Sequence, residues 1–170
     1  MTENKKPKVA IVMGSDSDFP VLKKCIQVLK QFEVEVDVNV ISAHRTPEKA
    51  EQFAKNAEAN GIDVIIGAAG KAAHLPGVLA AFTTLPIIGL PIKSSTMDGL
   101  DSLLSIVQMP KGIPVATVAI DGAENAALLA VQMLSLAYEN LKTKLKAFKI
   151  EMAKQVEEKD SLIKQEVSKL

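Results

Sequence analysis

Five short apolar runs, each followed by apolar residues at helical spacing, constrain the fold of this chain more than any other feature. Four of the runs are continuous, which is typical of strands buried on both faces of a parallel sheet, and one alternates with β-branched residues. We expect strands at Val9–Met13, Val34–Ile41, Val64–Gly67, Pro86–Leu90 and Val115–Ile120. Strands that alternate with helices over short connections predict an α/β fold, with helices on both faces of a parallel sheet.

The segments between the runs carry helix signals. Apolar residues recur at helical spacing from Val21 to Phe32. Pro47 suits a first turn with Thr46 as its N-cap, and Gly61 suits the stop of a helix that runs to about Asn60. Three further helices are expected over about 75–83, over about 100–108, and from Glu124 onward.

The organisation along the chain follows from length and from a shift in composition. A chain of 170 residues makes one domain the default, and we place it at 9–138, after a flexible, lysine-rich terminus at 1–8. Residues 139–170 form a long helical extension, with lysines and glutamates around an apolar stripe. Either this helix folds back on its own subunit or frays, or it lies across a neighbouring subunit and ties the oligomer together. The stripe consists of Leu141, Leu145, Phe148, Met152, Val156, Ile163, Val167 and Leu170.

Composition excludes several function classes. The net charge is zero, tryptophan is absent and aromatic residues make up 4%, so we expect no nucleic-acid partner. No apolar stretch reaches the ~18 residues of a membrane span, and no signal sequence is evident, so we expect a cytoplasmic protein. The single cysteine, Cys25, lies on an apolar helical face and is predicted to be core rather than nucleophile.

The chemistry is concentrated in two short segments. Both histidines and the only arginine lie in Ser42–Pro47 and Gly70–Gly77, and each segment follows a predicted strand. Because parallel strands bring their carboxyl ends to one edge of the sheet, His44, Arg45 and His74 should meet there. Histidine titrates near neutrality and arginine matches phosphate or carboxylate, so the pattern predicts an anion site where protons move.

A third loop, Gly14–Asp18, follows the first strand and combines a glycine with hydroxyls and carboxylates. It suits a phosphate cradle at a helix start, yet the same residues are also favoured helix caps, and both interpretations stay open. Likewise, His44 and His74 could serve only to hydrogen-bond their loops. The chain has no Walker pattern and no G-x-G-x-x-G, and neither histidine has the spacing of a metal site, so we expect no metal and no cofactor.

Four motifs occur in order: AIVMGSDSD at 10–18, SAHRTP at 42–47, GKAAHLPG at 70–77 and DSLLSIVQMP at 101–110. Together they closely resemble the 5-(carboxyamino)imidazole ribonucleotide mutases, a family also described as the catalytic subunit of phosphoribosylaminoimidazole carboxylase. The likeness covers roughly 9–136. It implies a three-layer αβα, flavodoxin-like fold of five strands, a homo-octamer, and a small-molecule ribonucleotide substrate in purine biosynthesis.

The resemblance also implies roles for individual residues. His44 and His74 match catalytic positions, with His44 as the proton shuttle and His74 beside the trapped carbon dioxide. Ser15 and Arg45 match the phosphate contacts, and Asp18 matches the ribose contact. The remaining predicted substrate-binding residues are Gly14, Ser17, Ser42, Ala43, Gly70, Ala72, Ala73 and Leu75.

Two alternatives and two departures accompany this prediction. The alternatives are a related carboxylase that uses free carbon dioxide on aminoimidazole ribonucleotide, and a non-catalytic ribonucleotide-binding module. The departures are Lys71, where family members commonly have glycine, and Asp98, where they have asparagine or serine. We expect Lys71 to face solvent, but a cation beside a carboxylate site could instead tighten binding or slow release.

Overall fold

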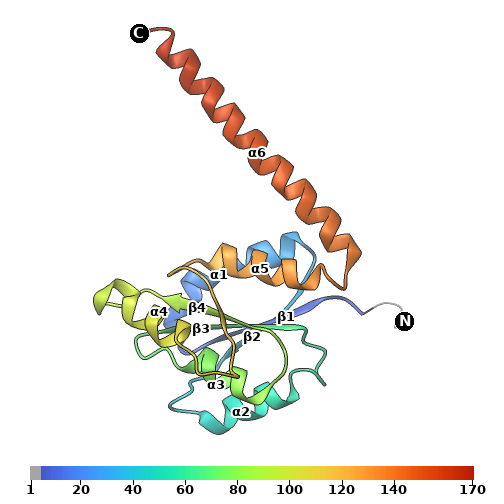
Figure 1. The fold of residues 1–170 in the computed structure, drawn as a ribbon, viewed down its shortest axis with the longest axis vertical. Helices are drawn as coiled ribbons and strands as arrows, with labels where there is room; N and C mark the ends of the chain where they lie inside the picture. Colours follow the sequence, from blue (N-terminus) through green and yellow to red (C-terminus); the bar gives the residue numbers. More distant parts are fainter. Residues whose placement is uncertain (1–4) are drawn as a thin grey trace.

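The computed structural model describes residues 5–170 and contains one five-stranded parallel sheet between two layers of helices (Figure 1). The strand order is β2-β1-β3-β4-β5, the order of the flavodoxin-like fold, so the predicted fold class is confirmed. The strands are β1 (Lys8–Met13), β2 (Glu35–Val40), β3 (Val64–Gly70), β4 (Ile87–Ile92) and β5 (Ala116–Thr117).

Each face of the sheet has its own core. The helices α1 (Phe19–Gln31) and α5 (Ala123–Leu134) cover one face, and α2 (Pro47–Asn56), α3 (Leu75–Phe82) and α4 (Leu100–Val107) cover the other. Residues of the interior strand β1 alternate between the two cores, because successive side chains of a strand point to opposite faces. Cys25 is fully buried under α5, where burial raises the pKa of its thiol to about 12, as expected for a core residue.

Four features differ clearly from the sequence prediction, and the first two concern β3 and α2. β3 continues through Ala68 and Ala69 to Gly70, where a loop was expected, because these small residues pair in register with β4. α2 ends at Asn56 rather than Asn60 and gives way to a turn, although Gly61 does adopt the left-handed conformation of a stop, with φ of 77°.

The two remaining differences concern Thr46 and the last strand. The side chain of Thr46 does not cap α2; instead its hydroxyl donates to the carbonyl of Ser42 at 3.0 Å. β5 has two residues rather than the predicted six. Beyond it the chain touches β4 only at intervals, where the amides of Val118 and Asp121 donate to β4 carbonyls.

The chain ends in α6 (Glu139–Val167), a helix of 29 residues that projects away from the domain (Figure 1). Its first turns belong to the core: Leu141 is fully buried, and the ring of Phe148 meets that of Phe32 edge-on, with 5.8 Å between centroids. Lys144 forms an ion pair with Glu33 at 2.8 Å. From residue 149 onward every side chain is exposed, so this part of the helix does not fold back on its own domain.

These contacts refine the predicted division of the chain. The extension expected over 139–170 does begin with α6, but its packing against the 9–138 domain continues to Phe148. Of the flexible terminus expected over 1–8, residues 1–4 lie outside the described residues, whereas Lys8 is in β1 and Lys5 pairs with Asp63. Among residues 5–170, no helix combines the length and apolar character needed to cross a membrane.

Candidate active site

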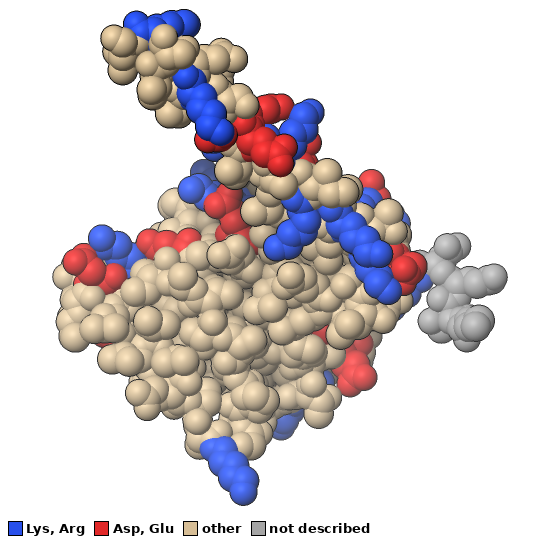
Figure 2. Space-filling model, turned by 45° about the horizontal axis from the view of Figure 1, so that its top comes forward, with Lys and Arg blue, Asp and Glu red and all other residues tan. Residues whose placement is uncertain are grey.

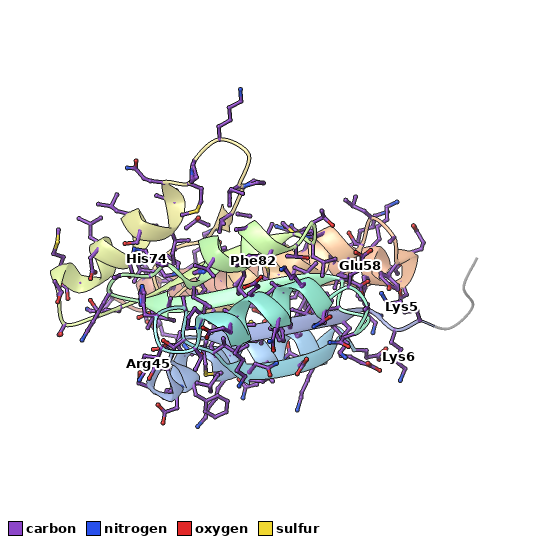
Figure 3. The ribbon with its side chains drawn as sticks, turned by 90° about the horizontal axis from the view of Figure 1, so that it is seen from below. Lys5, Lys6, Arg45, Glu58, His74 and Phe82 are labelled. Carbon is purple, nitrogen blue, oxygen red and sulfur yellow. The ribbon has the colours of Figure 1, made fainter. Side chains whose placement is uncertain are left out.

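The carboxyl ends of four neighbouring strands border one pocket of about 560 Å³. Figure 3 shows Arg45 and His74 at this end of the sheet, with Lys5, Lys6 and Glu58 at the opposite end. All the predicted site residues except Ala73 line the pocket: Gly14, Ser15, Ser17, Asp18, Ser42, Ala43, His44, Arg45, Gly70, Ala72, His74 and Leu75. Ala73 is fully buried and packs into the core beside α3, so only its backbone is available to the loop.

The loop after β1 is organised by its own side chains. The Ser15 hydroxyl accepts hydrogen bonds from the amide and the hydroxyl of Ser17, at 3.3 and 2.9 Å. Ser15 therefore caps the short 3-10 turn Asp16–Asp18 and also lines the pocket, so capping and ligand binding are compatible here. Asp18 is buried, and this burial raises the pKa of its carboxyl group.

The loop after β2 is tied to the loop after β1 through Arg45. The backbone amide and the Nε of Arg45 donate to the Ser42 hydroxyl, and one terminal guanidinium nitrogen donates to the Gly14 carbonyl at 3.2 Å. These contacts use part of the donor set and fix the guanidinium at the mouth of the pocket. Its remaining N–H groups can bind an anion in a fork geometry.

The two histidines, 30 residues apart in sequence, form a direct pair. Nε2 of His44 lies 2.8 Å from Nδ1 of His74, and the rings meet edge-on at 79° with 4.9 Å between centroids. Only one hydrogen can occupy this contact, so one ring donates and the other accepts. The second nitrogen of each ring, Nδ1 of His44 and Nε2 of His74, stays available to a ligand. The pair can therefore hold and move a proton at the pocket wall.

Sequence reasoning missed the contribution of β4. Its last residue, Ile92, and the two that follow, Lys93 and Ser94, complete the pocket wall together with Ala69. The signal was present, because residues directly after a parallel strand lie at the same edge as the histidine loops. Lys71, noted above as a departure, also lines the pocket and has a left-handed backbone with φ of 56°.

The arrangement defines what chemistry the pocket can perform. It joins a fixed guanidinium, serine hydroxyls, a buried carboxyl and a histidine pair, which suits a phosphorylated, hydroxyl-bearing ligand on which a proton moves. Within the described part of the chain, no three histidine, cysteine, aspartate or glutamate side chains are placed to share a metal ion.

Comparisons with known proteins agree with a pocket that binds a phosphorylated ligand. The family model for AIR carboxylase matches residues 8–155. The N5-carboxyaminoimidazole ribonucleotide mutase of Pyrococcus abyssi is 63% identical over 146 residues, which cover 86% of this chain and 84% of that protein. The phosphoribosylaminoimidazole carboxylase of Saccharomyces cerevisiae is 52% identical over 151 residues, which cover 89% of this chain but 26% of that longer protein.

A solved structure supports the fold independently. The crystal structure of Treponema denticola PurE superposes with a TM-score of 0.85 at 33% identity, and the match covers 92% of this chain and 98% of that one.

Proposed function

Because the chain belongs to the AIR carboxylase family, we propose that it is a mutase of purine biosynthesis. It converts 5-(carboxyamino)imidazole ribonucleotide to 4-carboxy-5-aminoimidazole ribonucleotide. The observation that carries this proposal is the His44–His74 pair in one pocket with Arg45, in a chain 63% identical to a protein of that name.

Substrate binding follows from the polar groups of the pocket. The phosphate of the ribonucleotide lies against the free N–H groups of Arg45 and the Ser15 hydroxyl, where charge-assisted hydrogen bonds are strong. Asp18 accepts hydrogen bonds from the ribose hydroxyls. Gly14, Ser17, Ser42 and Ala43 shape the two loops around these groups, and Leu75 closes the floor.

The reaction requires that one proton be donated to the exocyclic nitrogen and that one be removed from ring carbon four. His44 protonates the exocyclic nitrogen as its bond to the carboxylate carbon breaks, which releases carbon dioxide and a neutral amine. Ring carbon four then attacks the carbon dioxide, and its displaced proton returns to His44, so the enzyme ends as it began. His74, 2.8 Å from Nε2 of His44, fixes the orientation and tautomer of that ring.

Carbon dioxide must stay in the pocket between the two steps. We assign this task to His74 and to the backbone of the Gly70, Ala72 and Ala73 segment, whose small side chains leave the amides accessible. In a single chain His44 and His74 are both exposed, so a further wall is required to exclude water. A neighbouring subunit supplies that wall in the homo-octamer that we propose.

The surface agrees with subunit contacts. On the face shown in Figure 2, the body of the domain carries few charged side chains, whereas Lys and Glu gather on the projecting helix α6. Large apolar side chains are also exposed along α4, at Leu100, Leu104 and Val107. Large apolar side chains exposed together on a helix are typical of interfaces between protein chains. We further propose that the assembly is cytoplasmic.

The second candidate is a carboxylase that adds free carbon dioxide to aminoimidazole ribonucleotide. The name of the yeast relative favours it, although that protein is less similar and about four times as long as the matched region. The same pocket would serve, because only the source of the carbon dioxide differs.

One assay separates these functions. Purified protein is given either 5-(carboxyamino)imidazole ribonucleotide or aminoimidazole ribonucleotide with bicarbonate, and the 4-carboxy product is followed by absorbance. A mutase turns over the first substrate rapidly and independently of bicarbonate. Turnover of the second substrate alone would establish the carboxylase, and binding without turnover of either would establish a non-catalytic ribonucleotide-binding module.

A further inference from the structure

Lys93 lies directly after β4, at the edge of the sheet that borders the pocket. Lys71 is the first residue after β3, and the two lie side by side because Gly70 and Ile92 are partners in the strand register. Both lysines line the pocket on the side away from Arg45.

The backbone of Lys93 is held firmly, whereas its ammonium group makes only a weak contact. Its backbone amide donates to the Asp121 carboxylate at 2.8 Å, and Gly99 folds so closely over it that a Cβ there would lie 3.0 Å from the Lys93 Cα. The ammonium group pairs with Asp98 at 3.2 Å, but the two side chains are 58% and 88% exposed. Ion pairs this exposed contribute little to stability, so another carboxylate can displace Asp98.

The segment that carries Asp98 is itself strained. Met97, Asp98 and Gly99 follow one another with φ values of 50°, 52° and 92°, and only glycine adopts this conformation without a penalty. The carboxylate of Asp98 thus reaches Lys93 from a strained segment of backbone.

The spacing of the cations fits a ligand with two anionic ends. Arg45 lies in the loop after β2 and Lys93 directly after β4, and these two strands are three strand spacings, or about 14 Å, apart in the sheet. Both residues line the pocket, so a ribonucleotide whose phosphate faces Arg45 can extend toward Lys93. The carboxylated imidazole end then points toward β3 and β4.

On these grounds we propose that Lys93 is a positioning residue that binds the carboxylate of the substrate and product, exchanging Asp98 for it. The inference rests on the proposed function, since it assigns the second anionic group of that substrate. Lys93 in this role holds the carboxylated end of the ring beside the histidine pair.

Two ligands that differ only in this carboxylate provide the test: 4-carboxy-5-aminoimidazole ribonucleotide and 5-aminoimidazole ribonucleotide. Calorimetric titration of Lys93→Met should show affinity for the carboxylated ligand reduced about three- to tenfold, the scale of a partly exposed charge-assisted hydrogen bond. Affinity for the other ligand should be unchanged. Lys93→Arg should retain most of the difference, and Asp98→Asn should bind the carboxylated ligand at least as tightly as the unaltered protein.

The matched control is Lys111→Met, which removes an exposed lysine that does not line the pocket. It should affect neither ligand, and all variants should melt at the same temperature. Equal losses for both ligands in Lys93→Met, or no loss for either, would overturn the assignment while the unaltered protein still bound both. If the unaltered protein bound neither ribonucleotide, the proposed function would fail and the role of Lys93 with it.

Discussion

Two truncations of α6 separate the part of this helix that stabilises the domain from the part that we assign to subunit contacts. A chain that ends after Asn140 loses Leu141, whose full burial contributes about 1.5–3 kcal/mol. It also loses the half-buried Phe148 and its edge-on contact with Phe32, about 1–2 kcal/mol more. The expected loss is therefore about 2.5–5 kcal/mol, a large share of a typical stability of about 5–15 kcal/mol.

A chain that ends after Lys149 keeps these contacts and loses only exposed residues. Urea unfolding at low protein concentration should show the loss of stability for the first truncation but not for the second. Light scattering should nevertheless find a smaller particle for the second truncation, because the apolar stripe that continues through Val156 and Ile163 is gone. These side chains are 65% and 59% exposed in the single chain.

A full-length pair of variants controls for the effect of shortening. Val156→Lys with Ile163→Lys places two charges on the stripe, and Ser161→Lys with Gln165→Lys places the same two charges away from it. Only the first pair should reduce the particle size. Full-size, fully active particles from the chain ending after Lys149 would refute the role of the outer helix in assembly. Equal urea midpoints for both truncations would refute the packing argument.

Four further changes test the site and the core. His44→Asn should lower turnover by about 10²-fold with unchanged melting, because the ring is exposed and acts by proton transfer; near-normal turnover would transfer that role to His74. Arg45→Lys should weaken substrate binding about ten- to a hundredfold and leave the dephosphorylated nucleoside unaffected, since a point charge replaces a fork; equal losses would show that Arg45 does not contact the phosphate. Burial raises the pKa of Asp18, so its ionised form opposes folding at neutral pH. Asp18→Asn should therefore raise stability at neutral pH, with the gain fading as pH falls through the raised pKa and absent below the ordinary aspartate value; a gain that grows in acid would contradict this sign. Gly89→Ala should lower the free energy of unfolding by about 1–3 kcal/mol or more, because its Cβ would lie 2.3 Å from the Ile106 side chain. An unchanged melting temperature would show that the surrounding side chains rearrange to accommodate the methyl group.

Local pattern predicted the fold well because buried strands and amphipathic helices differ in the period of their apolar residues. It failed where pairing rather than local preference decides. The Ala68–Gly70 segment resembles a loop by composition, yet it is strand, since its amides and carbonyls meet those of β4. The apolar run Val115–Ile120 resembles a full strand, yet only Ala116 and Thr117 pair, at the edge of the sheet.

The candidate site shows the same contrast between what local pattern predicts and what long-range contacts determine. The amino-acid pattern predicted which loops carry chemistry, because a strand's carboxyl end follows from chain order. His44, Arg45, His74 and the Gly14–Asp18 loop could therefore be named in advance. How these groups meet depends on the folded arrangement of the strands. The 2.8 Å histidine contact, the Arg45 bond to the Gly14 carbonyl and the approach of Lys93 all join residues far apart in the chain. Such contacts depend on strand order and register, which are fixed by the packing of the whole core and not by any local segment.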